Sequence, residues 1–77
     1  MFTSAQLRAA RAILKWSLVE LSEKSGIGTT TLKRFEAAEG VPNGHISTFA
    51  KLVEIFNEAG VEMTGTPDNR PGVCLKK

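Results

Sequence analysis

The chain has very few of the residues that cross-link a small fold or carry out catalysis. Its 77 residues include one cysteine, one histidine and no tyrosine. A single cysteine excludes an internal disulfide, and one Cys with one His is too few ligands for the usual zinc sites. The sequence also lacks a Ser-His-Asp or Cys-His arrangement and a phosphate-cradling glycine loop. We therefore expect no enzyme, no metal site and no cofactor.

Long apolar stretches are absent as well. No run approaches the roughly 18 residues that a membrane span needs. The first ten residues, MFTSAQLRAA, lack the basic head and apolar core of a signal peptide. Together with the lone thiol, these features predict a cytoplasmic protein without membrane association. The net charge of +2 is compatible with nucleic-acid binding, but the positions of the charges must decide the matter.

Helical periodicity and capping residues predict four helices in the first 60 residues. Thr3 and Ser17 each begin a capping box, and Gly26 and Gly60 stand where helices should end. The expected helices cover residues 4–15, 18–25, 29–38 and 45–59. The apolar stripe of the fourth helix, which starts at Ile46, is wider than one packing face needs. Its spare residues, Leu52 and Ile55, are expected to face another surface.

The tail changes to the two-residue period of β-strands. Residues 61–64 and 73–76 alternate between apolar and polar types, and the segment GTPDNRPG between them is rich in turn formers. We predict a two-stranded hairpin with a long loop, which lies on Leu52 and Ile55 and leaves one edge open to another chain. The fold class is thus mainly α. Residues 1–60 form the helical domain and 61–77 a tail that is expected to dimerise.

The second and third predicted helices, joined by a short turn containing Gly26, match the helix-turn-helix pattern. In that motif the first turn of the second helix enters the DNA major groove. Here that turn holds three threonines, which are short and offer a hydroxyl to polar groups and a methyl to thymine. Arg34 can reach guanine, and Lys33 can reach a base or phosphate. The competing interpretation is that these threonines only cap a solvated helix.

Four segments carry a resemblance to a known family: RAARAILKWS, ELSEKSGI, TLKRFE and the loop around Pro42 before the fourth helix. They resemble the Xre-type, or Cro/repressor-type, helix-turn-helix regulators of bacteria and phages, over about residues 6–59. The resemblance implies a lambda-repressor-like bundle of four or five helices that binds palindromic operators as a dimer. The predicted hairpin stands where the family has a fifth helix.

The resemblance also implies roles for individual residues. By match to the family motif, the base-reading residues are Thr29, Thr30, Lys33 and Arg34. The residues placed to contact phosphates are Ser17, Gly28, Asn43, Gly44 and His45. Arg11 and Glu36 occupy the positions of a structural ion pair that joins the first helix to the third.

Two functions follow from the sequence. The first is a sequence-specific regulator, either a repressor or an autoregulator, that binds double-stranded DNA as a homodimer. Its candidate interface consists of Leu52, Ile55, Val61, Met63, Val73 and Leu75. The alternative is a protein-interaction module, such as an antitoxin or antiactivator, that uses the tail to bind another protein. No small-molecule ligand is evident.

Overall fold

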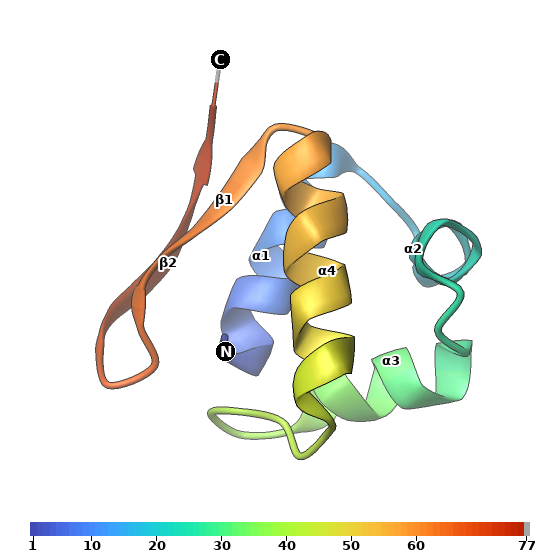
Figure 1. The fold of residues 1–77 in the computed structure, drawn as a ribbon, viewed down its shortest axis with the longest axis horizontal. Coiled ribbons are helices and arrows are strands. Elements are labelled where there is room, and N and C mark those ends of the chain that lie inside the picture. The colour runs from blue at the N-terminus through green and yellow to red at the C-terminus, as the bar shows by residue number, and fades with distance from the viewer. Residues whose placement is uncertain (77) are drawn as a thin grey trace.

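The computed structural model describes residues 1–76 as four helices followed by a two-stranded antiparallel sheet. The elements are α1 (Ser4–Leu14), α2 (Leu18–Ser25), α3 (Thr29–Ala37), α4 (Ile46–Glu58), β1 (Val61–Thr66) and β2 (Asn69–Leu75). Helix α4 runs through the middle of the molecule, with the hairpin on one side and α2 and α3 on the other (Figure 1). The four predicted helices and the hairpin are confirmed. Within residues 1–76 no helix has both the length and the apolar character to cross a membrane.

The helix ends follow from local chemistry. Both predicted capping boxes are present: Thr3 with Gln6 at the start of α1, and Ser17 with Glu20 at the start of α2. Gly26 ends α2 in the left-handed conformation, with φ 75°. Helix α1 ends one residue earlier than predicted because Lys15 adopts the same conformation, with φ 58°.

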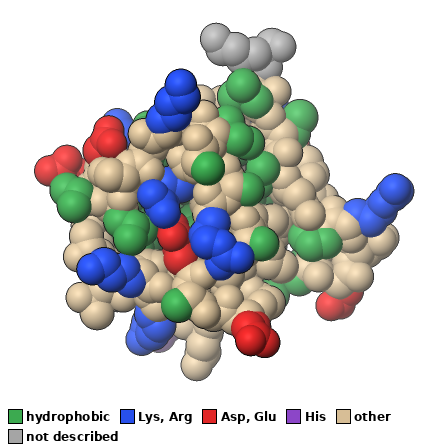
Figure 2. All heavy atoms as spheres, turned by 180° about the vertical axis from the view of Figure 1, so that it is seen from behind, with side chains coloured by type: hydrophobic (Ala, Val, Ile, Leu, Met, Phe, Trp, Pro, Cys, Tyr) green, Lys and Arg blue, Asp and Glu red, His purple; other side chains and the backbone are tan. Residues whose placement is uncertain are grey.

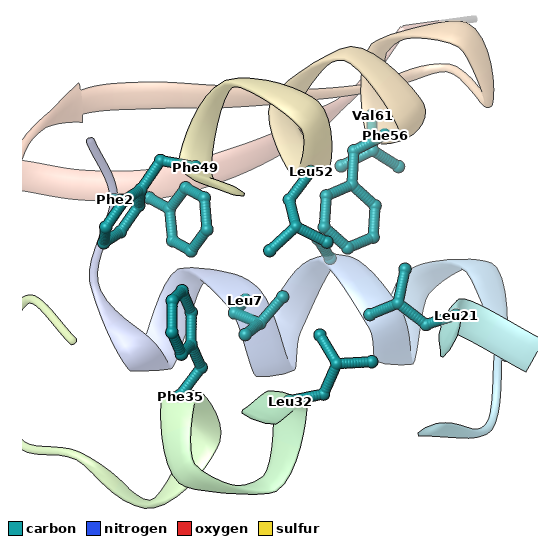
Figure 3. Packing of buried hydrophobic residues seen from close by; sticks show 10 residues of the cluster. Phe2, Leu7, Leu21, Leu32, Phe35, Phe49, Leu52, Phe56 and Val61 are labelled. Carbon is teal, nitrogen blue, oxygen red and sulfur yellow. The ribbon is translucent and has the colours of Figure 1, made fainter. Parts of the chain in front are cut away.

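The core is one cluster of ten buried apolar side chains, drawn from every helix, the first residues of the chain and β1 (Figure 3). Within this cluster, Phe49 lies between two other rings. Its ring centroid is 4.9 Å from that of Phe2 and 5.3 Å from that of Phe35. Because α3 contributes Leu32 and Phe35 to this cluster, its outer face is held in a fixed orientation.

Two expectations about surface residues are wrong. Leu52 and Val61, predicted to contact a second chain, are both 0% exposed within the core of a single chain. The reason is the central position of α4, which is covered on one side by the helices and on the other by β1. Ile46, at the start of the apolar stripe, is 76% exposed.

The hairpin is longer than predicted and its turn is shorter. Residues paired across it include Val61 with Leu75, Met63 with Val73, and Thr66 with Asn69, so only Pro67 and Asp68 remain in the turn. The pairing shifts by one residue between Thr64 and Thr66. Such a bulge inserts an extra residue into one strand. Gly65 and Arg70 adopt left-handed conformations, with φ 70° and 54°. The strands therefore stay paired within residues 65–72, although the composition of this segment favours a loop.

Gln6 attaches the hairpin to α1. Its side chain is buried and forms three hydrogen bonds. Oε1 accepts a bond from the Thr3 N–H at 2.8 Å, and Nε2 donates to the carbonyl oxygens of Thr64 at 3.0 Å and Gly72 at 2.8 Å. One amide therefore closes the cap of α1 and binds both strands of the hairpin.

Candidate nucleic-acid interface

The turn between α2 and α3 is fixed by its own hydrogen bonds. The Gly26 N–H donates to the Ser22 carbonyl at 2.8 Å, and the Ser22 hydroxyl donates to the Ile27 carbonyl at 2.6 Å. The Ile27 N–H in turn donates to Ser25 Oγ at 3.1 Å. Leu21 of α2 and Leu32 of α3 are both buried beneath the turn. Helices α2 and α3 are consequently held together as one rigid unit.

The outer face of α3 has polar groups without partners. Among residues 1–76, the side chains of Thr30, Lys33 and Arg34 are exposed and form no hydrogen bond or ion pair. Gly28 is the N-cap and supplies no side-chain acceptor, so the first N–H groups of α3 are uncapped. Thr29 is half-buried at the start of the helix. An uncapped helix start is favourable for a phosphate or another anion. Lys33 and Arg34 add positive charge further along the same helix.

Arg11 and Glu36 form the predicted ion pair between α1 and α3. Arg11 Nε donates to one carboxylate oxygen at 2.7 Å and Nη2 to the other at 2.9 Å. Arg11 Nη1 also donates to the Trp16 carbonyl at 3.0 Å. The hydrogen bonds that Arg11 donates to the Glu36 carboxylate raise the pKa of Arg11 above its ordinary value. The pair, with Arg8 donating to the Glu36 backbone carbonyl, fixes the end of α3 to α1.

Several basic side chains lie on the face of the molecule that Figure 1 hides. Figure 2, the view from behind Figure 1, shows several Lys and Arg side chains around a carboxylate near the centre of that face. Other acidic side chains lie at the edges of the view.

Ser17 offers less to a phosphate than its position suggests. Its N–H already donates to Glu20 Oε1 at 3.0 Å, and its Oγ accepts from the Glu20 N–H at 3.0 Å. Only the hydroxyl proton remains available. The hydrogen bond from the Ser17 N–H, with a further contribution from the Ser17 hydroxyl, lowers the pKa of Glu20, so a carboxylate stands next to the expected contact. A phosphate at Ser17 would meet this negative charge.

The loop between α3 and α4 carries the other predicted phosphate contacts. Asn43, Gly44 and His45 are all exposed, and His45 is the N-cap of α4 without a side-chain capping bond. Gly44 has a structural role that sequence reasoning missed. A Cβ atom there would lie 2.4 Å from Cζ of the buried Phe35 ring. The loop backbone thus packs directly on the aromatic core below it.

We expect Gly44→Ala to destabilise the fold by about 1–3 kcal/mol, the usual cost of overpacking. Phe35 is held by Phe49 and cannot move away without disturbing the core. Urea unfolding measures the change, and Gly28→Ala is the matched control because a Cβ atom there meets nothing within 4 Å. Equal losses in the two variants would contradict the packing role.

The remaining predicted interface residues lie in two places. Ile55 is half-buried and lines an open hollow with Trp16, Lys24, Glu58 and Ala59. Trp16 stacks on Phe56 with centroids 5.9 Å apart, and Lys24 Nζ lies 5.0 Å from the centre of the indole. Met63 and Val73 pack against the core from the hairpin, whereas Leu75 stays exposed.

Within residues 1–76, no group of three or more His, Cys, Asp and Glu side chains could hold a metal ion.

The chain matches no protein-family model, and no curated protein shows a significant similarity to it.

Proposed function

We propose that this protein is a sequence-specific regulator of transcription that binds double-stranded DNA through a helix-turn-helix in a lambda-repressor-like arrangement. The observation that carries the proposal is the outer face of α3. That face combines an uncapped first turn, short hydroxyl side chains and two free cations on a helix whose inner face is fixed in the core. A rigid helix of this kind suits insertion into the major groove.

Each group on this face has a chemical role in the proposal. The hydroxyls of Thr29 and Thr30 hydrogen-bond base edges or phosphates, and their methyl groups contact thymine. Arg34 donates two hydrogen bonds to guanine, and Lys33 donates to a base or phosphate. The uncapped N–H groups after Gly28, together with the loop at Asn43–His45, hold the DNA backbone.

A single α3 would contact few base pairs. Its nine residues are about 13 Å long. A two-fold dimer places two such helices about 34 Å apart on a palindromic site. Residues 1–76 measure 28 × 28 × 19 Å, so two copies side by side are of a suitable size for this spacing. The protein is therefore proposed to act as a homodimeric repressor or autoregulator in the cytoplasm.

Selection of binding sites from a random duplex library tests the proposal. We expect enrichment of an inverted repeat with half-sites about one helical turn apart. Titration of that site at two salt concentrations then counts the phosphate contacts from the salt slope. Weak binding without any enriched sequence would overturn the proposal.

Alanine at the base-reading positions should weaken binding to the selected site. We expect Thr30→Ala and Arg34→Ala each to cost about 1–3 kcal/mol, which is roughly 5- to 150-fold in the dissociation constant. Fluorescence anisotropy measures the change. Arg70→Asn is the matched control because it removes a positive charge from the far end of the hairpin and suits the left-handed backbone there. Equal effects of Arg34→Ala and Arg70→Asn would mean that only net charge matters.

The alternative function, a protein-interaction module of the antitoxin or antiactivator type, is favoured by one observation. The β2 strand lies at the outside of the molecule and carries the exposed Leu75. If the module binds a protein partner as its main role, alanine at Thr29, Thr30 and Arg34 will leave regulation in the cell intact. Substitutions in β2 will then abolish it.

A further inference from the structure

The hydrogen-bond pattern of the hairpin shows which backbone groups point outward. The Lys76 N–H donates to the Gly60 carbonyl at 2.7 Å, and Val61 is the partner of Leu75. In an antiparallel ladder this makes Val61–Leu75 a non-hydrogen-bonded pair, and Met63–Val73, two residues further on, is another. The N–H and C=O groups of Val73 and Leu75 therefore point away from β1.

The outward edge of β2 is open. Helix α4 packs on β1, and α1 contacts both strands. In Figure 1 the part of β2 nearest the C-terminus has no other element on the side away from β1. Within residues 1–76, the only contact to these four outward groups is a weak one from Cys74 Sγ to the Leu75 carbonyl at 3.8 Å. The side chain of Leu75 is 49% exposed at the same place. Proteins usually prevent such an edge from pairing with another chain by means of a bulge, a proline or a charged side chain.

In β2, the features that prevent edge pairing lie only at the end of the strand next to the turn. The bulge and Pro71 distort β2 near Arg70, whereas Gly72–Leu75 keeps regular pairing and carries no charged side chain. The open portion thus offers two donors and two acceptors in a row. A strand with this pattern is complementary to a second copy of itself in antiparallel orientation.

We propose that the outer edge of β2 pairs with the same edge of a second copy of this chain, in the register that places Cys74 opposite Cys74. In this register Val73 of each copy pairs with Leu75 of the other, and all four outward groups of each copy are used. Centring the pairing on Val73 would bring in the bulged segment at Pro71, which has no N–H to donate. The result is a continuous four-stranded sheet across a two-fold axis.

The proposed register makes a geometric prediction about the thiols. The two Cys74 residues form a non-hydrogen-bonded pair, whose Cα atoms lie about 4.5 Å apart. This is within the range of about 4.4–6.8 Å found in disulfides. Cys74 is exposed, so a reagent can reach it. Disulfide formation between the two native Cys74 residues can therefore report the proposed pairing, and no cysteine has to be introduced.

Oxidation of the full-length protein by diamide, which takes up the two thiol hydrogens, tests the register. We expect a disulfide-linked dimer on non-reducing electrophoresis as the main product. The matched control is Cys74→Ser/Glu62→Cys. Glu62 is exposed and faces Cys74 within one chain, but in the proposed sheet the two copies of this position are three strand spacings apart. Equal cross-linking of the control, or none in the native protein, would overturn the proposal.

Leu75→Pro tests the hydrogen bonds themselves. The proline removes an N–H that makes no bond within the chain, so the ladder and the urea unfolding curve should be retained. We expect the dimer dissociation constant, measured by sedimentation equilibrium, to rise at least tenfold relative to Leu75→Ser, which loses the side chain but keeps the N–H. Equal dimerisation of the two variants would exclude this edge.

The inference rests on the proposed function for its biological purpose, but the two can fail separately. If cross-linking succeeds and site selection finds no sequence, the interface stands and the DNA-binding proposal falls. If an inverted repeat is selected while Leu75→Pro dimerises like Leu75→Ser, the regulator stands and the interface falls. A protein that stays monomeric at all concentrations also overturns the interface.

Discussion

Replacing Gln6 by leucine should destabilise the protein by about 2–6 kcal/mol, although the two side chains are similar in size. The buried Thr3 N–H would lose its acceptor, and a buried polar group without a partner costs about 1–3 kcal/mol. The carbonyls of Thr64 and Gly72 would each lose one donor, at about 0.5–1.5 kcal/mol apiece. This is a large part of the 5–15 kcal/mol typical of a whole domain.

Urea unfolding monitored by tryptophan fluorescence measures this loss. Asn57→Leu is the matched control because it exchanges the same functional group on an exposed helix position. We expect Gln6→Leu to lower the midpoint and the control to leave it nearly unchanged. If the two variants unfold at the same urea concentration, the amide of Gln6 does not hold the hairpin.

Arg11→Met should lower the free energy of unfolding by about 3–5 kcal/mol, because it leaves the Glu36 carboxylate without its partner. That side chain is only 11% exposed, so water cannot replace the guanidinium. Thermal unfolding is a suitable measurement, since 1 kcal/mol shifts the midpoint of a domain of this size by about 4–8 °C.

The double variant Arg11→Met/Glu36→Leu separates loss of packing from loss of charge balance. Replacing both members of a buried ion pair by apolar residues is often neutral or stabilising. We expect the double variant to unfold near the native temperature. If it is as unstable as Arg11→Met alone, the stranded carboxylate is not the cause.

The local features of this chain could be predicted from its sequence because their causes are local. The capping boxes at Thr3 and Ser17 and the left-handed Gly26 fix helix ends through atoms three or four residues apart. The Arg11–Glu36 pair was also predicted, but through the resemblance to a known family and not from periodicity.

Features that depend on distant residues could not be predicted. Leu52 and Val61 were expected on the surface because periodicity shows that a side chain is apolar without showing what covers it. Gln6 was recognised as part of a cap, yet its bonds to residues 58 and 66 positions away have no signal in a single sequence. The packing of Gly44 on Phe35 was hidden for the same reason.

The amide of Gln6 also has a consequence for the order of folding during synthesis. Its partners, Thr64 and Gly72, are made 58 and 66 residues after it, so the N-terminal cap cannot acquire its final contacts until both strands of the hairpin have emerged from the ribosome. Contacts between such distant residues raise the contact order and slow folding. Helix α1 is therefore expected to reach its final packing only after the hairpin has formed, and a chain cut short before residue 72 should lack the contacts that attach the hairpin to α1.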